Sequence, residues 1–255
     1  MNSPLSLTGK RWILPESPLS ADIDIVAYIA RARGLSDLSG SEKLSDPFLF
    51  PEMGRAVERI HAAVDAGEII GIFGDYDADG ITGTAQLVRY FRRHGREPVV
   101  HLPHREKDGY GMKKNSLDVL HTKGVGLLIT VDTGIAARAE IEHANALGMD
   151  VIVTDHHSAP EGRPPAFAVI HPRVPSPYPN EHLSGSGVAF TLVRALEGGK
   201  PWRGIEEDMV LAAIGTVGDL VPLTGENRTL VIHGLRMIPR LPPSALKSFF
   251  EQVNI

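Results

Sequence analysis

The sequence has no cysteine, no long apolar run and few aromatic residues, which make up 6% of its 255 positions. Without cysteine, disulfides and thiolate metal sites are excluded, so oxygen and imidazole groups must hold any metal ion. No stretch reaches the apolar length of a membrane-spanning helix, and the N-terminus lacks the basic-then-apolar pattern of a secretion signal. We therefore expect a soluble cytoplasmic protein with no membrane contact.

The chain also lacks an excess of positive charge, because its formal net charge is -5. This balance argues against a generally basic nucleic-acid coat but is compatible with a local basic groove. A hydrophobic content of 42% supports a substantial core, as one large domain or as a domain with a subdomain.

Short apolar runs alternate with helical patterns over the middle of the chain. Consecutive apolar residues are typical of strands buried on both faces, and alternation with helices is typical of a parallel sheet. The predicted strands cover 69–73, 98–102, 127–131, 151–154 and 168–170, and helices lie near 81–94, 115–121 and 136–147. These patterns predict an α/β fold: a doubly wound, mainly parallel five-stranded sheet with helices on both faces.

The two ends of the chain follow other patterns. Residues 1–50 are rich in Ser, Pro and Leu, and we expect an N-terminal extension with one helix from about Asp22 to Gly34. We expect the main domain at 51–255, with a helical cap on the sheet over about 186–255. The helical patterns in this domain outside the sheet region are 51–66, 186–196, 206–217 and 228–238.

Three acids follow three of the predicted strands. Asp75 comes after the strand at 69–73, and Asp132 and Asp155 come after the third and fourth strands. The carboxyl ends of parallel strands meet at one edge of a sheet, which is where ligands bind in open α/β folds. Three separate stretches of sequence therefore bring carboxylates to one place.

Asp75 begins a group of alternating acids that continues with Asp77 and Asp79. In an extended segment such residues point to one side, and their like charges repel unless a cation lies among them. The alternative is a solvated acidic turn that caps the following helix. Three acids directly after a buried strand favour the cation site.

The second group is Asp155-His156-His157. One imidazole is expected to ligate metal and the other to face a substrate phosphate or a water molecule. Asp155 is expected to hold the tautomer of an imidazole as its hydrogen-bond partner. The alternative is a helix-capping aspartate with two surface histidines. Asp219 is a single acid in an apolar run, so we expect it to be paired, to cap a helix or to bind metal.

Oxygen ligands with one or two imidazoles suit Mn²⁺ or Mg²⁺. Five or six such groups are more than one catalytic ion takes from a protein, whereas two ions about 4 Å apart that share a carboxylate fit the count. Such a pair generates hydroxide at neutral pH and stabilises charge on a phosphoryl group.

Six segments carry a family resemblance: GDYDADG at 74–80, PHREKDGYG at 103–111, VDTGI at 131–135, DHH at 155–157, SGSGVAF at 184–190 and GTVGDLVPL at 215–223. In this order they resemble the DHH phosphoesterase superfamily and, within it, the RecJ-type single-strand-specific exonucleases. The resemblance implies a Mn²⁺- or Mg²⁺-dependent hydrolase that digests single-stranded DNA from 5′ to 3′ in DNA repair and recombination. Single-stranded nucleic acid, with DNA favoured, and single-strand-binding or repair proteins are the implied partners.

The resemblance also implies roles for individual residues. The implied metal ligands are Asp77, Asp79, Asp132, His156 and Asp219, with Asp75 in the same cluster. His157 is implied to contact a phosphate or water, and Arg105 is a candidate phosphate clamp. The turn that contains Ser186 and Gly187 begins a helix, so we expect its backbone N–H groups to face phosphate.

Two features depart from RecJ-type enzymes. Those enzymes carry a second domain with a Gly-rich, His-containing motif and often an OB-fold, and neither is present in this sequence. We therefore expect either a fragment of a longer protein or a free-standing DHH domain. His171 stands before Pro172 where relatives are expected to have asparagine, and its ring either approaches the site or belongs to an ordinary loop.

Three functions remain open from the sequence. The leading one is a metal-dependent nuclease for single strands, with a basic loop as phosphate track and Tyr110 as the best-placed aromatic; the loop comprises His104, Arg105, Lys107, Lys113 and Lys114. The second is a phosphodiesterase for short oligonucleotides or cyclic dinucleotides. The third is a non-catalytic DHH-fold scaffold that binds nucleic acid or replication proteins, which the complete set of acids and histidines disfavours.

Overall fold

The computed structural model describes residues 7–11, 24–32, 43–109, 111–160, 162–174, 178–199, 204–242 and 244–253. The chain forms two units, Met1–Ser39 and Gly40–Ile255. In the smaller unit the helix α1 (Ile25–Ala32) forms within the range predicted for it. It begins after Asp24, whose carboxylate accepts hydrogen bonds from the backbone N–H groups of Val26 and Ala27 in the first turn. The predicted limits at Asp22 and Gly34 lie outside the described residues.

The larger unit begins about ten residues before the predicted boundary at 50/51. The short helix η1 (Pro47–Leu49) leads into Phe50, which is buried and stacks on Tyr178 with 4.0 Å between ring centroids. Arg194 donates a hydrogen bond of 3.0 Å to the backbone oxygen of Ser45. These contacts attach the segment from residue 43 onwards to the core, and the local sequence does not indicate them because Tyr178 and Arg194 are distant in the chain.

The sheet has five strands in the order β2-β1-β3-β4-β5, and every neighbouring pair is parallel. Its strands are β1 (Ile69–Gly74), β2 (Val99–His101), β3 (Val125–Val131), β4 (Asp150–Thr154) and β5 (Ala168–Ile170). All five predicted strands are present, with ends that differ by at most two residues. The consecutive apolar residues of β3 and β4 are buried on both faces of the sheet.

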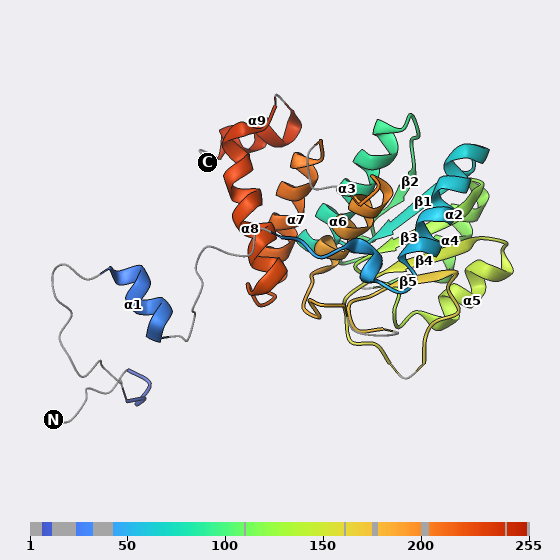
Figure 1. The fold of residues 1–255 in the computed structure, drawn as a ribbon. Helices are drawn as coiled ribbons and strands as arrows, with labels where there is room; N and C mark the ends of the chain where they lie inside the picture. Colours follow the sequence, from blue (N-terminus) through green and yellow to red (C-terminus); the bar gives the residue numbers. More distant parts are fainter. Residues whose placement is uncertain are drawn as a thin grey trace. The chain divides into compact units, whose positions relative to one another are not determined.

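Helices cover both faces of the sheet, which confirms the predicted doubly wound α/β fold. The helices α2 (Met53–Ala66), α3 (Ala78–Arg93) and α6 (Gly185–Leu196) share one hydrophobic core with Ile72 and Ile129 of the sheet. The helices α4 (Lys114–Thr122) and α5 (Arg138–Ala146) share a second core with Leu128 and Val153, which point to the opposite face. Figure 1 shows the strands between these helices.

The C-terminal helices are more closely integrated than a cap on the sheet. Every residue of α6 is buried, so this helix is part of the layer that covers the sheet. Next come α7 (Glu206–Gly218), which packs against α3, and α8 (Gly225–Met237), which packs against α7. The helices η2 (Ile238–Arg240) and α9 (Ala245–Gln252) follow; α9 was not predicted. None of the described helices is long and apolar enough to cross a membrane.

The strand order reverses between β1 and β3. The chain passes from β1 outward to β2 on one side, and then from β3 through β4 to β5 on the other. Ligands in open α/β sheets bind beyond the carboxyl ends of the strands at such a reversal. Asp75 follows β1 and Asp132 follows β3, so both acids lie at this point of the fold.

Candidate metal centre

The first acidic group begins at the end of β1 and enters α3. Asp75 is buried, and Asp77 is the residue that caps α3. The Asp77 carboxylate accepts hydrogen bonds from the backbone N–H groups of Asp79 and Gly80, at 2.9 and 3.0 Å, through Oδ1. Because of this cap, α3 begins three residues before the predicted start at Ile81. The capping alternative thus describes Asp77 correctly, but it leaves the burial of Asp75 and Asp79 unexplained.

Asp79 is fixed by the N-terminus of α6. Its carboxylate oxygens accept hydrogen bonds from the backbone N–H groups of Gly185 and Ser186, at 2.6 and 2.9 Å. The backbone N–H of Gly187 donates to the hydroxyl of Ser184, at 3.1 Å. The expectation that Ser186 and Gly187 present these N–H groups to a phosphate does not agree with this geometry. The helix terminus binds an anion as expected, but the anion is the protein's own carboxylate.

Two glycines leave room for the acidic side chains. A Cβ atom on Gly185 would lie 2.5 Å from Oδ1 of Asp132, and one on Gly215 would lie 2.7 Å from Oδ1 of Asp79. Real Cβ atoms do not approach other atoms so closely. Any larger residue at either position would therefore displace a carboxylate of the cluster.

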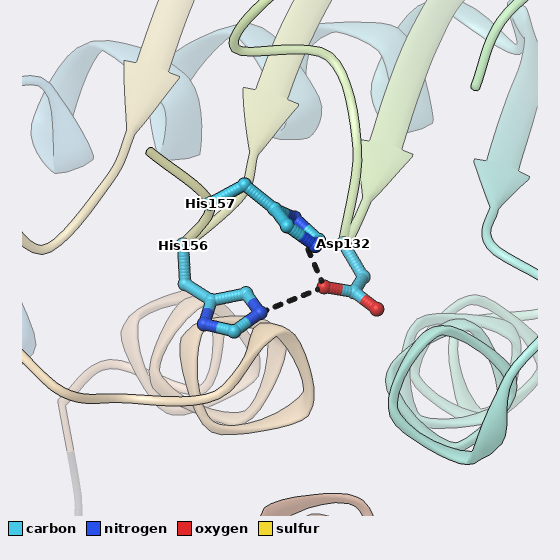
Figure 2. Close-up of side chains that lie close together, drawn as sticks. All are labelled: Asp132, His156 and His157. Carbon is cyan, nitrogen blue, oxygen red and sulfur yellow. Dashed lines mark ion pairs between the residues drawn. The ribbon is translucent and has the colours of Figure 1, made fainter. Parts of the chain in front are cut away.

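Asp132 lies at the centre of the site, directly after β3. It is 1% exposed and adopts a left-handed backbone conformation with φ of 60°, which is uncommon for a residue other than glycine. Its Oδ1 atom lies 3.1 Å from Nε2 of His156 and 3.7 Å from Nδ1 of His157. Figure 2 shows both imidazoles directed at this carboxylate. Backbone strain at this position is typical of a functional residue that the surrounding structure holds in place.

Asp155 supports the two histidines. Its carboxylate accepts hydrogen bonds from the backbone N–H groups of Ile135, His156 and His157 and from Nδ1 of His157, the last at 2.9 Å. Burial alone would raise the pKa of Asp155, but these hydrogen bonds and the charge of His157 outweigh it and lower the pKa. The same hydrogen bond raises the pKa of His157. Asp155 therefore stays ionised and fixes the orientation of the His157 ring.

His171 and Arg173 hold the backbone of the two histidines. Nε2 of His171 donates to the carbonyl oxygen of His157 at 2.8 Å, while its Nδ1 accepts from the backbone N–H of Arg173 at 3.1 Å. A ring that donates through one nitrogen and accepts through the other is neutral, and burial lowers the pKa of His171 accordingly. Arg173 donates to the carbonyl oxygen of His156 at 2.5 Å. The His171 side chain thus supports the site by holding the backbone of His157, a role that its position before Pro172 did not reveal.

The acids and histidines form three overlapping groups whose ligand atoms lie within 4.8 Å of one another. The groups are Asp75 with Asp77 and Asp132; Asp132 with His156 and His157; and Asp79 with His156 and Asp219. Asp132 belongs to two of them, as does His156, so the three groups are continuous. Asp219 reaches them from the end of α7, where its Oδ2 atom lies 3.6 Å from Nε2 of His156.

The chemistry of these groups fits divalent cations. Oδ1 of Asp75, Oδ1 of Asp132 and Nε2 of His156 are buried and have no hydrogen-bond partner among the described residues. Buried polar atoms normally have a hydrogen-bond partner, so three buried ligand atoms without one indicate a site for an ion. Burial is the main cause that raises the pKa values of Asp75, Asp79, Asp132 and Asp219, and the negative charges of neighbouring acids add to it. A divalent cation among these carboxylates would offset both effects and keep them ionised.

A basic loop lies beside the first acidic group. The Arg105 guanidinium carbon is 5.6 Å from the ring centroid of Tyr76, which is the residue between Asp75 and Asp77. This cation–π contact holds the charge of Arg105 close to the acids. Tyr76 was missed from the sequence because an aromatic residue between two acids has no characteristic pattern, and Tyr110 lies outside the described residues.

Fold and site together define a class: an α/β protein with a carboxylate and histidine cluster for divalent cations at the sheet reversal. A family profile described as "DHH family, N-terminal domain" matches residues 69–216. The chain belongs to the DHH family, as the sequence motifs indicated.

Among its relatives is the single-stranded-DNA-specific exonuclease RecJ of Bacillus subtilis, 42% identical over 207 residues, which cover 81% of this chain and 26% of that protein. A crystal structure of exonuclease RecJ bound to manganese superimposes with a TM-score of 0.74 at 38% identity, covering 83% of this chain and 54% of that one. RecJ of Thermus thermophilus in complex with Mn²⁺ also gives 0.74, at 34% identity, with coverage of 88% and 33%. RecJ of Escherichia coli is 41% identical over 197 residues, so the chain spans about a quarter of the Bacillus subtilis protein and about a third of the Escherichia coli one.

Proposed function

We propose that this chain is the DHH portion of a metal-dependent exonuclease that hydrolyses single-stranded DNA from the 5′ end. The observation that carries the proposal is the continuous set of three ligand groups joined by Asp132 and His156. The relatives named as single-stranded-DNA-specific exonucleases match this chain over most of its length. Two of the solved relatives contain Mn²⁺ and a third contains Mg²⁺.

The residues divide naturally between two ions. Asp75 and Asp77 would hold one ion, and Asp79, His156 and Asp219 would hold the other. Asp132 shares one ligand group with Asp75 and Asp77 and another with His156, so it would contribute to holding both ions. When bound, such a pair of Mn²⁺ or Mg²⁺ ions lowers the pKa of a water molecule and offsets the negative charge on a phosphoryl group.

The chain's own residues prepare the site for a phosphodiester. Asp155 fixes the orientation of His157 through the bond to Nδ1, so the ring faces the same side as Asp132. The raised pKa of His157 favours its cationic form, which suits contact with a phosphate oxygen. Arg105 is exposed and supported by Tyr76, and its fixed charge would orient a further phosphate. The backbone N–H groups at the N-terminus of α6 hold the Asp79 carboxylate in position.

The substrate and the setting rest on the relatives rather than on the site alone. A single strand fits an acidic chain that carries a local basic loop at residues 104–114. We propose action on DNA in the cytoplasm, in repair or recombination, together with single-strand-binding or repair proteins.

Hydrolysis of a 5′-labelled single strand in Mn²⁺ tests the proposal. We expect mononucleotide release by the parent chain, and a loss of at least about 100-fold in kcat/KM for Asp132→Asn, because the bridging ligand is removed. The matched control is Asp118→Asn, which changes an exposed acid paired with His143. This control should keep the parent rate.

Three results would separate the alternatives. Activity confined to dinucleotides would indicate a phosphodiesterase for short oligonucleotides. Binding of the strand without hydrolysis, unchanged in Asp132→Asn, would indicate a non-catalytic scaffold. Equal activity of Asp132→Asn and Asp118→Asn would refute the assignment of the metal centre.

A further inference from the structure

Leu220 has a backbone conformation that its side chain disfavours. It follows Asp219 at the end of α7 and has φ of 60°, and its N–H donates to the carbonyl oxygen of Val217 at 3.3 Å. Helices often end with one residue in this left-handed conformation, and that residue is usually glycine. Among the described residues, Asp132 and Leu220 are the non-glycine residues with positive φ. Both belong to the segments that build the metal centre.

The fold gains little from leucine at this position. The side chain of Leu220 is 88% exposed, so packing in the core does not compensate for the backbone conformation. Glycine would satisfy the helix end without strain and would also remove an apolar group from water. Residues held in disfavoured conformations without a packing reason occur mainly at functional sites. The observation therefore points to a contact that Leu220 makes with something outside the described chain.

The position of Leu220 limits what that partner is. Its neighbour Asp219 lies 3.6 Å from His156, so Leu220 stands at the rim of the acidic cluster. The exposed side chain of Val217 precedes it on α7, and Ile81, also exposed, lies on α3, against which α7 packs. A Cβ atom on Gly218 would lie 3.0 Å from Cβ of Ala78, one turn before Ile81, so this part of the rim joins the two helices. This part of the rim therefore carries exposed apolar side chains, whereas the centre holds charged ligands.

We propose that Leu220 contacts a nucleobase of the bound strand next to the phosphodiester at the metal centre. The inference rests on the proposed function. In a nucleotide the charged phosphate and the apolar face of the base are joined by the sugar, so a site for the phosphate leaves the base at its rim. An aliphatic side chain covers the face of any base and excludes water from it, which suits a nuclease that acts on all sequences. A single projecting leucine is large enough to cover one base. A protein partner with a flat surface would instead require a broad apolar face.

The test compares Leu220→Ala and Leu220→Gly in the full chain on two single strands of equal length. One strand has all its bases, and the other has abasic residues at its three terminal positions. On the first strand we expect KM to rise about fivefold to tenfold for both variants, because part of an apolar contact is lost, with kcat within about twofold of the parent. On the abasic strand we expect parent and variants to have the same KM. Leu235→Ala is the matched control, since Leu235 is 58% exposed on α8.

A stability measurement separates the contact from an effect on folding. Leu220→Gly removes the disfavoured conformation, so its melting temperature should rise by about 2–4 °C while its KM rises. Unchanged KM on the complete strand would overturn the inference, and so would an equal rise on both strands, which would assign Leu220 to contact with protein. If the parent hydrolyses neither strand and does not bind a hydrolysis-resistant phosphorothioate strand, the proposed function itself fails.

Discussion

Replacement of Asp155 by asparagine tests how strongly the second acidic motif is supported. The carboxylate is 1% exposed and accepts four hydrogen bonds, three through Oδ1 and one, from Ile135 N–H, through Oδ2. Asparagine can keep its oxygen toward the three donors, but its amide group then faces the Ile135 N–H, a second donor. One bond to a charged acceptor is lost, and a buried donor is left unsatisfied. Each of these effects costs on the order of 1–3 kcal/mol, and relief from burying a charge offsets part of the sum.

We therefore expect Asp155→Asn to lower the free energy of unfolding by about 2–4 kcal/mol, or the melting temperature by roughly 5–15 °C. Activity should fall about 10-fold to 100-fold because the His157 ring loses its fixed orientation. Urea unfolding followed by circular dichroism gives the first quantity, and initial rates on a labelled single strand give the second. Asp118→Asn, which removes one exposed ion pair, should cost less than about 1 kcal/mol. A free energy of unfolding within about 0.5 kcal/mol of the parent, together with full activity, would refute the reasoning.

Three further predictions concern other parts of the larger unit. Gly185→Ala should fold but bind Mn²⁺ about 10-fold or more weakly in a calorimetric titration, because the added Cβ displaces the Asp132 carboxylate. Asp208→Asn should lower the free energy of unfolding, measured in urea, by about 2–3 kcal/mol. This buried acid accepts hydrogen bonds of 2.7 Å from both Arg89 and Arg93 across the α3–α7 contact. Both arginines are partly exposed, so the loss should be smaller than for a fully buried pair. His101 has its pKa lowered, mainly by burial, so the folded protein binds fewer protons there than the unfolded chain. The stability that the lowered pKa of His101 contributes is present above the ordinary histidine pKa and is lost as pH falls below it. His101→Gln should therefore reduce the loss of stability measured between pH 7.5 and pH 5.5, which bracket the ordinary pKa of about 6.5.

The strands and most helices were predictable because their signals are local. Runs such as Leu127–Val131 are apolar on consecutive residues, and only a strand covered on both faces accounts for that pattern at this length. The predicted boundary at 50/51 differs from the division at Ser39/Gly40 because Phe50 stacks on Tyr178, which is distant in the sequence. The helix α9 was missed; it is only eight residues long and buries a single residue, Phe250.

The grouping of the acids was predictable from one rule, that carboxyl ends of parallel strands meet at the same edge. The groups that support them were not predictable, because they act through backbone atoms. Nothing in the local sequence indicates that the N–H groups of Gly185 and Ser186 bind Asp79, which is about a hundred residues away. The same holds for His171, whose partner is a carbonyl oxygen.

Manganese binding tests the central claim, that the acids and histidines form one centre for two divalent ions. Titration of the metal-free chain with Mn²⁺, followed by electron paramagnetic resonance and calorimetry, measures how many ions bind and whether they interact. We expect two ions per chain with a spin-coupled spectrum, because Asp132 shares one ligand group with Asp75 and Asp77 and another with His156. In Asp132→Asn the coupling should disappear and at least one ion should be lost, while Asp118→Asn should behave as the parent. Binding of no Mn²⁺, or two uncoupled ions that Asp132→Asn leaves unchanged, would contradict the account.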